Sequence, residues 1–86
     1  MLKVFGAKWC PHCVDTVAYL EKNKIDFQYI DIETQPESVV QAVIQANGGD
    51  DWVVPTLEFQ GRWREGRVFN EQELKTDLEN LGVFSD

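Results

Sequence analysis

Two cysteines separated by two residues, Cys10 and Cys13, are the residues of this chain best suited to chemistry. The chain has no other cysteine, so a disulfide framework is excluded, and a disulfide between positions this close would restrict the unfolded chain little. Cysteines at this spacing are typical of redox sites, where one thiolate attacks a disulfide and a second thiol releases the product. The alternatives are an incidental buried pair without activity and half of a zinc site that includes His12. Zinc, however, takes four ligands, and the sequence has no second cluster. We therefore expect a redox site and no metal.

The residues around the cysteines assign them different roles. Pro11 predicts that a helix begins between them, because proline is favoured at the first helical position. Cys10 is then the N-cap, where free backbone N–H groups and the helix dipole stabilise an anion, so it should ionise more readily than a free thiol and attack. Cys13, one turn further in, should be the resolving thiol. A protonated His12 would help to stabilise the Cys10 thiolate, and an exposed histidine without effect is the alternative.

The elements that must position the cysteines are predicted from hydrophobic periodicity. Residues 2–6 are a short apolar run ending at glycine, which indicates a buried strand. A helix is expected from Pro11 to about Asn23, and residues 27–32 are rich in aromatic and branched side chains, as in a second strand. Strand, helix and strand in this order predict a parallel, right-handed crossover. The apolar stripe expected on the helix consists of Cys13, Val14, Val17 and Leu20.

The middle of the chain predicts a second helix. Thr34 and Glu37 have the spacing of a capping box, with Thr34 as the cap. Asn47-Gly48-Gly49 should end this helix, because glycine adopts the left-handed conformations that stop one.

The remaining residues predict a hairpin and a third helix. Leu57 and Phe59 alternate with polar neighbours as in a half-buried strand, and Gln60-Gly61 is a tight turn that leads into Arg62-Trp63-Arg64. The last helix is indicated by a cap at Asn70 with Glu73, a face of Leu74, Leu78 and Leu81, and a terminal Gly82.

Composition limits the function further. Eighty-six residues make one domain, residues 1–86, and the formal charge of −7 argues against nucleic-acid binding, which needs clustered cations. The first apolar run, residues 2–7, is too short for a signal h-region or a membrane span, so a cytoplasmic protein without a membrane partner is expected. A monomer is expected as well.

Two motifs of the chain resemble the thioredoxin-like proteins and, among them, the glutaredoxins. They are Cys10-Pro11-His12-Cys13 after the first strand and Val54-Pro55-Thr56 at the start of the third. The resemblance covers essentially the whole chain. It implies an α/β domain whose elements follow one another along the chain as β-α-β-α-β-β-α, with a four-stranded mixed sheet flanked by three helices. It also implies a thiol–disulfide oxidoreductase that reduces protein disulfides or glutathione mixed disulfides, with no bound cofactor and with glutathione as co-substrate.

The resemblance assigns roles to three further residues. Pro55 should follow a cis peptide bond beside the sulfurs, which leaves the Val54 backbone free to pair with an extended peptide or with glutathione. A trans proline opening an edge strand is the alternative. Lys8 should favour the thiolate and bind a glutathione carboxylate, with a solvated lysine as the alternative. The Pro11-His12 pair resembles the dipeptide of the bacterial periplasmic disulfide oxidants, so a comparatively oxidising redox site is expected.

The chain departs from the family where glutaredoxins hold the γ-glutamyl end of glutathione. Gly-Gly and an acidic pair are usual there, but this chain has the segment Glu65 to Glu71, in which only Gly66 and Asn70-Glu71 are reminiscent of it. Thioredoxin reductase is therefore an alternative electron source to glutathione. A metal or iron–sulfur carrier is a remote alternative, because cluster-holding members usually resemble Cys-Gly-Phe-Ser or lack the proline.

Overall fold

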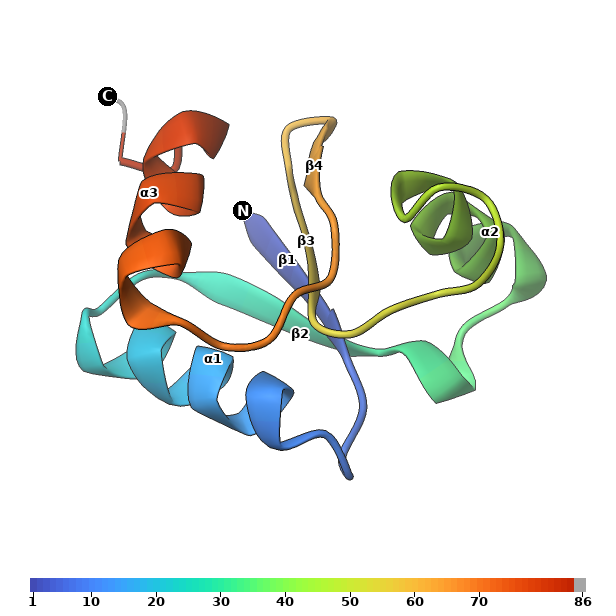
Figure 1. The fold of residues 1–86 in the computed structure, drawn as a ribbon, viewed down its shortest axis with the longest axis horizontal. Coiled ribbons are helices and arrows are strands. Elements are labelled where there is room, and N and C mark those ends of the chain that lie inside the picture. The colour runs from blue at the N-terminus through green and yellow to red at the C-terminus, as the bar shows by residue number, and fades with distance from the viewer. Residues whose placement is uncertain (85–86) are drawn as a thin grey trace.

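The structure, a computed structural model, describes residues 1–84 and contains a four-stranded mixed sheet and three α-helices (Figure 1). The sheet order is β2-β1-β3-β4, with β1 and β2 parallel and both other pairs antiparallel. The predicted fold class is confirmed, including the parallel crossover and the hairpin. In chain order the elements are β1 (Leu2–Gly6), α1 (Pro11–Lys22), β2 (Phe27–Asp31), the short 3₁₀ helix η1 (Ile32–Thr34), α2 (Glu37–Ala46), β3 (Thr56–Phe59), β4 (Arg62–Arg64) and α3 (Glu71–Leu81).

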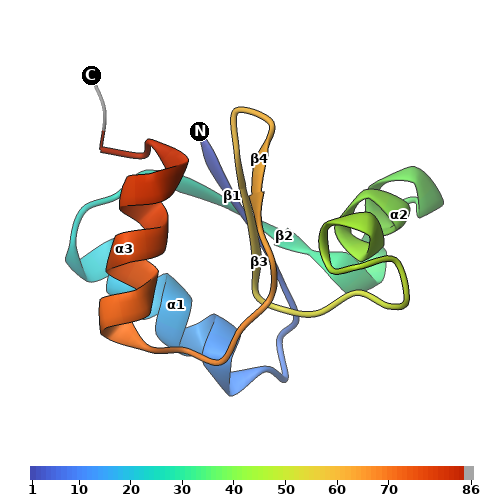
Figure 2. The same ribbon diagram turned by 45° about the horizontal axis from the view of Figure 1, so that its top comes forward.

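The helices cover both faces of the sheet. In Figures 1 and 2, α1 and α3 lie together on one face, and α2 lies on the other. Side chains alternate along β1, so Leu2 and Val4 face α1 and α3, whereas Phe5 faces α2. The larger core cluster consists of Leu2, Val4, Leu20, Leu57, Leu74, Leu78 and Leu81, and the smaller one of Phe5, Ile32 and Val43.

The turn and cap predicted near the C-terminus are confirmed. Gln60 and Gly61 both have positive φ, 52° and 83°, as a tight hairpin turn requires. The Asn70 side chain accepts a hydrogen bond from the Glu73 N–H at 3.0 Å, and Gly82 ends α3 in the left-handed conformation at φ 88°. These two residues fix both ends of α3.

The capping box predicted at Thr34 is wrong. The N-cap of α2 is Pro36, which makes no side-chain cap bond, and Thr34 belongs to η1. The reason is that Gln35 precedes a proline and is extended, with φ −90° and ψ 153°, so no helix can run from residue 34 through it. The Asp31 side chain caps η1 instead by accepting from the Glu33 N–H at 2.9 Å.

The apolar stripe predicted on α1 is only partly correct. Cys13 and Leu20 are buried, but Val14 is 58% exposed. Thr16 is buried in its place, and its hydroxyl donates to the His12 carbonyl at 2.8 Å, which satisfies a polar group inside the protein.

Within residues 1–84, none of the helices combines the length and the apolar character that crossing a membrane would require.

Candidate active site

Cys10 lies at the N-cap of α1. Its backbone is extended, with φ −90° and ψ 110°, and Pro11 is the first helical residue. The Cys10 Sγ accepts a hydrogen bond from the Cys13 N–H at 3.2 Å. The same N–H also donates to the Cys10 carbonyl at 3.1 Å, so it is shared between that oxygen and the sulfur. An N–H of the first turn pointing at a sulfur is the arrangement that stabilises a thiolate at a helix N-terminus.

The strand pairing brings a second segment of the chain against Cys10. β3 lies beside β1, and the residues just before β3 meet the residues just after β1. The Val54–Pro55 peptide bond is cis, as expected from the resemblance. The Cys10 thiol lies 3.8 Å from the Val54 carbonyl oxygen, to which it donates, and Val54 packs against Ala7 and both cysteines.

The two cysteines are free thiols in different surroundings. Cys13 is 1% exposed, and burial is the main cause that raises its pKa to about 12, followed by its hydrogen bond with Cys10. Cys10 is also buried, with 4% of its surface exposed, but its sulfur accepts a hydrogen bond from the Cys13 N–H. Cys13 therefore remains a protonated thiol over the physiological range of pH.

Gly6 brings Tyr29 next to Cys13. A Cβ at Gly6 would lie 2.9 Å from the Tyr29 Cε1 and 3.2 Å from the Cys13 Sγ, so any larger residue would have to displace the ring or the sulfur. Burial raises the pKa of the Tyr29 phenol, and the nearby Cys13 raises it further. The sequence contains no signal for this contact, since the strand pattern shows only that Gly6 ends β1.

His12 is bound to the segment that precedes α3. Its Nδ1 accepts a hydrogen bond from the Phe69 N–H at 3.1 Å. A nitrogen that accepts carries no proton, so Nδ1 serves as an acceptor here, and a proton on it would break this bond. His12 thus holds residue 69 near the first turn of α1, a contact that the sequence-based hypothesis of a charged His12 did not include.

Asn47 joins the start of β3 to the segment after β4. Its Nδ2 donates to the Val43 carbonyl at 2.8 Å and to the Thr56 Oγ1 at 2.9 Å, and its Oδ1 accepts from the Gly66 N–H at 2.7 Å. Gly66 in turn is packed so closely on Val53 that a Cβ there would lie 2.5 Å from the Val53 Cγ1. The sequence marked Asn47 only as part of a helix stop.

Lys8 is exposed, and within residues 1–84 it forms no ion pair. It lies at the edge of a largely apolar pocket of about 440 Å³ between α1 and β2. Cys13 and Tyr29 line the same pocket. Trp9, next to Cys10, is 64% exposed, and its indole N–H donates to the Glu33 carboxylate at 3.0 Å.

Among residues 1–84, no three side chains of His, Cys, Asp or Glu come together as a metal site would need. The arrangement described above is instead that of an N-cap thiol, a buried second thiol and a cis-proline segment alongside them.

The comparisons with known proteins agree with this geometry. The family model described as Glutaredoxin matches residues 2–63. A glutaredoxin from Archaeoglobus fulgidus has a similar structure, with a TM-score of 0.70 and 26% identity over 87% of this chain and 82% of that one. A thioredoxin-like protein, at 20% identity and a TM-score of 0.67 over 88% of this chain and 97% of its own, has the same fold. A buckwheat glutaredoxin solved as a glutathione complex has it too, at 18% identity and a TM-score of 0.65 over 95% of this chain and 70% of its own. No curated protein sequence matches this chain.

Proposed function

The chain belongs to the glutaredoxin family, and from this premise we propose that it is a thiol–disulfide oxidoreductase in which Cys10 attacks the substrate and Cys13 resolves the product. The observation that carries the proposal is the difference between the two sulfurs. The Cys10 Sγ accepts a helix N–H at 3.2 Å, whereas burial raises the pKa of Cys13 to about 12. An attacking thiolate and a thiol held in reserve are what a dithiol exchange needs.

The proposed reaction has two steps. The Cys10 thiolate attacks one sulfur of a substrate disulfide, the substrate S–S bond breaks, and the departing sulfur takes up a proton. Cys13 then loses its proton and attacks the Cys10 Sγ, which releases the second substrate sulfur as a thiol. Two electrons and two protons pass to the substrate, and the enzyme is left with a Cys10–Cys13 disulfide.

The Val54–Pro55 segment is proposed to bind the substrate. The Val54 carbonyl lies 3.8 Å from the Cys10 sulfur, so a chain extended along Val54 would have its disulfide beside that sulfur. Lys8 is proposed to bind a carboxylate of glutathione, and Pro11 and His12 to set the first turn of α1 that carries Cys10.

Glutathione is the first candidate for the reductant. Two molecules of it would reduce the Cys10–Cys13 disulfide and leave as oxidised glutathione. The buckwheat glutaredoxin of the same fold was solved with glutathione, which supports this choice. The reaction is proposed for a monomer formed by residues 1–86 in the cytoplasm, a reducing compartment in which a dithiol persists.

One observation favours thioredoxin reductase as a second candidate. The segment between β4 and α3 uses two of its backbone N–H groups internally, Gly66 on Asn47 and Phe69 on His12. These donors are not free for the γ-glutamyl carboxylate of glutathione, which glutaredoxins hold in this region.

The experiment that tests the proposal follows NADPH consumption with a small disulfide substrate. One assay contains glutathione with glutathione reductase, and the other contains thioredoxin reductase alone. Turnover in only one assay identifies the reductant. Absence of turnover in both would contradict the proposed oxidoreductase.

Serine variants of the two cysteines test the assigned roles. We expect Cys10→Ser to abolish turnover in either assay, because no attacking sulfur remains. Cys13→Ser should keep part of the activity on a glutathione mixed disulfide, which needs one thiol, and serves as the matched control. Equal activity of the two variants would contradict the roles of both sulfurs.

Replacing Lys8 tests the glutathione contact. Lys8→Gln should raise the KM for a glutathionylated substrate about fivefold and leave kcat unchanged, because one charge-assisted contact to a carboxylate is lost. Lys22→Gln, at the other end of α1, removes the same charge as a control. Equal KM values for the two variants would mean that Lys8 is a solvated surface residue.

A further inference from the structure

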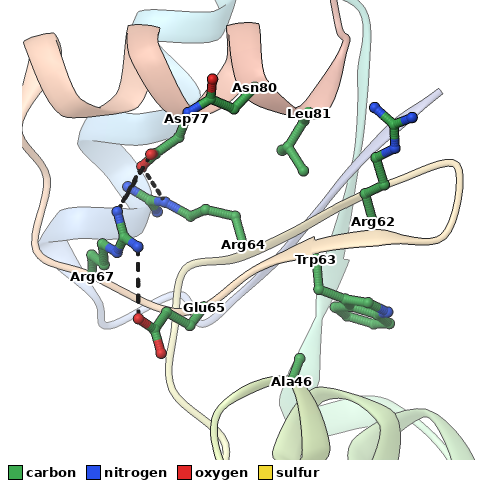
Figure 3. Close-up of a pocket in the computed structure, with 9 residues that line it drawn as sticks. All are labelled: Ala46, Arg62, Trp63, Arg64, Glu65, Arg67, Asp77, Asn80 and Leu81. Atoms are coloured by element: carbon green, nitrogen blue, oxygen red, sulfur yellow. Dashed lines mark hydrogen bonds and ion pairs between the residues drawn. The ribbon is translucent and has the colours of Figure 1, made fainter.

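A second pocket lies away from the cysteines, at the outer edge of the sheet. It has a volume of about 430 Å³ and is lined by β4, by the residues after it and by α3, with Ala46 of α2 at one end (Figure 3). None of the residues assigned to the redox reaction lines it. The side chains that give it its charge are Arg62, Arg64, Arg67, Glu65 and Asp77.

The pocket is positive in a strongly negative protein. It gathers three of the eight cationic side chains of a chain whose formal charge is −7. Asp77 faces two guanidinium groups at once: its Oδ2 accepts from the Arg64 Nε at 2.8 Å and from the Arg67 Nη1 at 3.1 Å. The pocket holds three guanidinium groups but only two carboxylates, Asp77 and Glu65, so one positive charge remains in excess.

Arg64 has a buried side-chain nitrogen without a hydrogen-bond partner. Its side chain is only 5% exposed, so water does not compensate for missing partners. Within residues 1–84, Asp77 is its only hydrogen-bond partner, through Nε, and the buried Nη1 has none. A buried guanidinium with unused N–H groups is costly, which makes it an indication of a missing acceptor.

The other two arginines are placed to complete an anion site. Arg67 is 41% exposed at the rim, and its Nη2 lies 3.6 Å from the Glu65 carboxylate, a loose contact. Arg62 is exposed and forms no ion pair within the described chain. In Figure 3 the guanidinium groups of Arg64 and Arg67 lie on one side of the pocket, with Arg62 on the other.

We propose that this pocket binds a small phosphate-bearing anion. Phosphate oxygens match the planar fork of an arginine and accept several N–H bonds at once. A small bend of the Arg64 side chain would turn its unused N–H groups to the anion, and Arg62 would close the site from the other side. The opposing view is that Arg64 serves only to attach α3 to β4 through Asp77, in which case no anion is bound.

Titration with inorganic phosphate tests the proposal. The guanidinium Nε–H signals of Arg62 and Arg64 are followed by two-dimensional NMR, with potassium chloride at the same ionic strength as reference. We expect phosphate to shift both signals along a saturating curve. Shifts that do not saturate, or that chloride reproduces, would overturn the proposal.

Arg62→Gln is the informative variant, because its exposed side chain has no partner within residues 1–84 whose loss would unfold the protein. It should weaken phosphate binding about tenfold, the effect of losing one charge-assisted contact. Lys75→Gln, on the exposed side of α3 outside the pocket, removes the same charge and should leave binding unchanged within about twofold. Equal weakening by both would indicate a general charge effect and overturn the site.

A second titration with adenosine 5′-monophosphate identifies the source of the phosphate. Tighter saturation than with inorganic phosphate indicates a phosphorylated small molecule, and weaker saturation indicates free phosphate. Saturation by neither ligand would leave Arg64 with a structural role alone and overturn the proposal.

Discussion

The C-terminal ends of α1 and α2 look alike locally but differ in what they connect. Asn23 follows α1 and Asn47 follows α2, and each side chain donates from Nδ2 to the carbonyl four residues earlier at 2.8 Å. The Asn23 amide makes no other hydrogen bond within residues 1–84. The Asn47 amide also bonds to Thr56 and to Gly66, and so ties the start of β3 to the segment after β4.

The difference shows that α1 and α2 contribute opposite ends to the active site: α1 its N-terminal end and α2 its C-terminal end. α1 contributes its first turn, with Cys10 as the N-cap and His12 bound to Phe69. α2 contributes its last turn through Asn47, which donates to the Thr56 hydroxyl. That hydroxyl donates in turn to the Val53 carbonyl, so residues on both sides of Val54–Pro55 are held.

The largest expected effect is that of Asn47→Ala. The change leaves the Gly66 N–H without its acceptor and removes two further hydrogen bonds, so the free energy of unfolding should fall by about 3 kcal/mol. Asn23→Ala is the matched control, with one exposed bond to lose and an expected cost of about 1 kcal/mol. Urea unfolding measures both.

A second measurement separates the effect of the change on stability from its effect on the active site. Asn47→Ala should change the rate at which iodoacetamide alkylates Cys10, because the Val54 segment shifts, and Asn23→Ala should not. Equal effects of the two variants on both measurements would remove the distinction between the two helix ends.

Gly66→Ala tests the other end of the hydrogen bond between Asn47 and Gly66. The new Cβ would lie 2.5 Å from the Val53 Cγ1 and 2.9 Å from the Val53 backbone carbon, so the segment must move, at a cost of about 2 kcal/mol in unfolding free energy. Gly48→Ala is the control for glycine conformation: φ is +98°, but nothing lies within 4 Å, and a cost of about 1 kcal/mol is expected. Only Gly66→Ala should alter Cys10 alkylation. An unchanged rate of Cys10 alkylation would mean that the Val53 side chain moves aside without displacing Val54.

The features predicted correctly from the sequence are those that depend on residues close together in the chain. The Cys10–Cys13 spacing with Pro11 predicted the helix start, Asn70 with Gly82 predicted both ends of α3, and Gln60-Gly61 predicted the hairpin turn. Each of these depends on residues within about one turn of one another, where backbone preferences decide the outcome.

The parts that were missed depend on residues far apart. Asn47 and Gly66 are nineteen positions apart, and only the sheet brings them together. The Thr34 capping box was wrong because the extended residue before Pro36 outweighs a favourable cap spacing. Arg64 and Asp77 likewise lie thirteen positions apart, and only the fold brings them together and buries Arg64 against α3.

A smaller effect is expected at the first turn of α1. His12→Ala removes the acceptor of the Phe69 N–H and should lower the free energy of unfolding by about 1 kcal/mol. His12→Gln, which offers a side-chain oxygen as acceptor, should recover part of this loss in the same urea experiment. Failure of glutamine to recover any stability would mean that the imidazole acts through packing and not through its Nδ1.

The smallest effect concerns Cys13 and appears only in alkali. Its pKa is about 12 in the folded protein and about 9.0 in the unfolded chain, so between these values the unfolded state loses a proton that the folded state keeps. The contribution of Cys13 to stability is therefore complete below pH 9 and declines as the pH rises towards 12. Urea unfolding under reducing conditions at pH 8 and pH 10 should show a decline about 1 kcal/mol larger for wild type than for Cys13→Ala. The same decline in both proteins would mean that Cys13 ionises as readily in the fold as outside it, and the division of labour between the two cysteines would lose its physical basis.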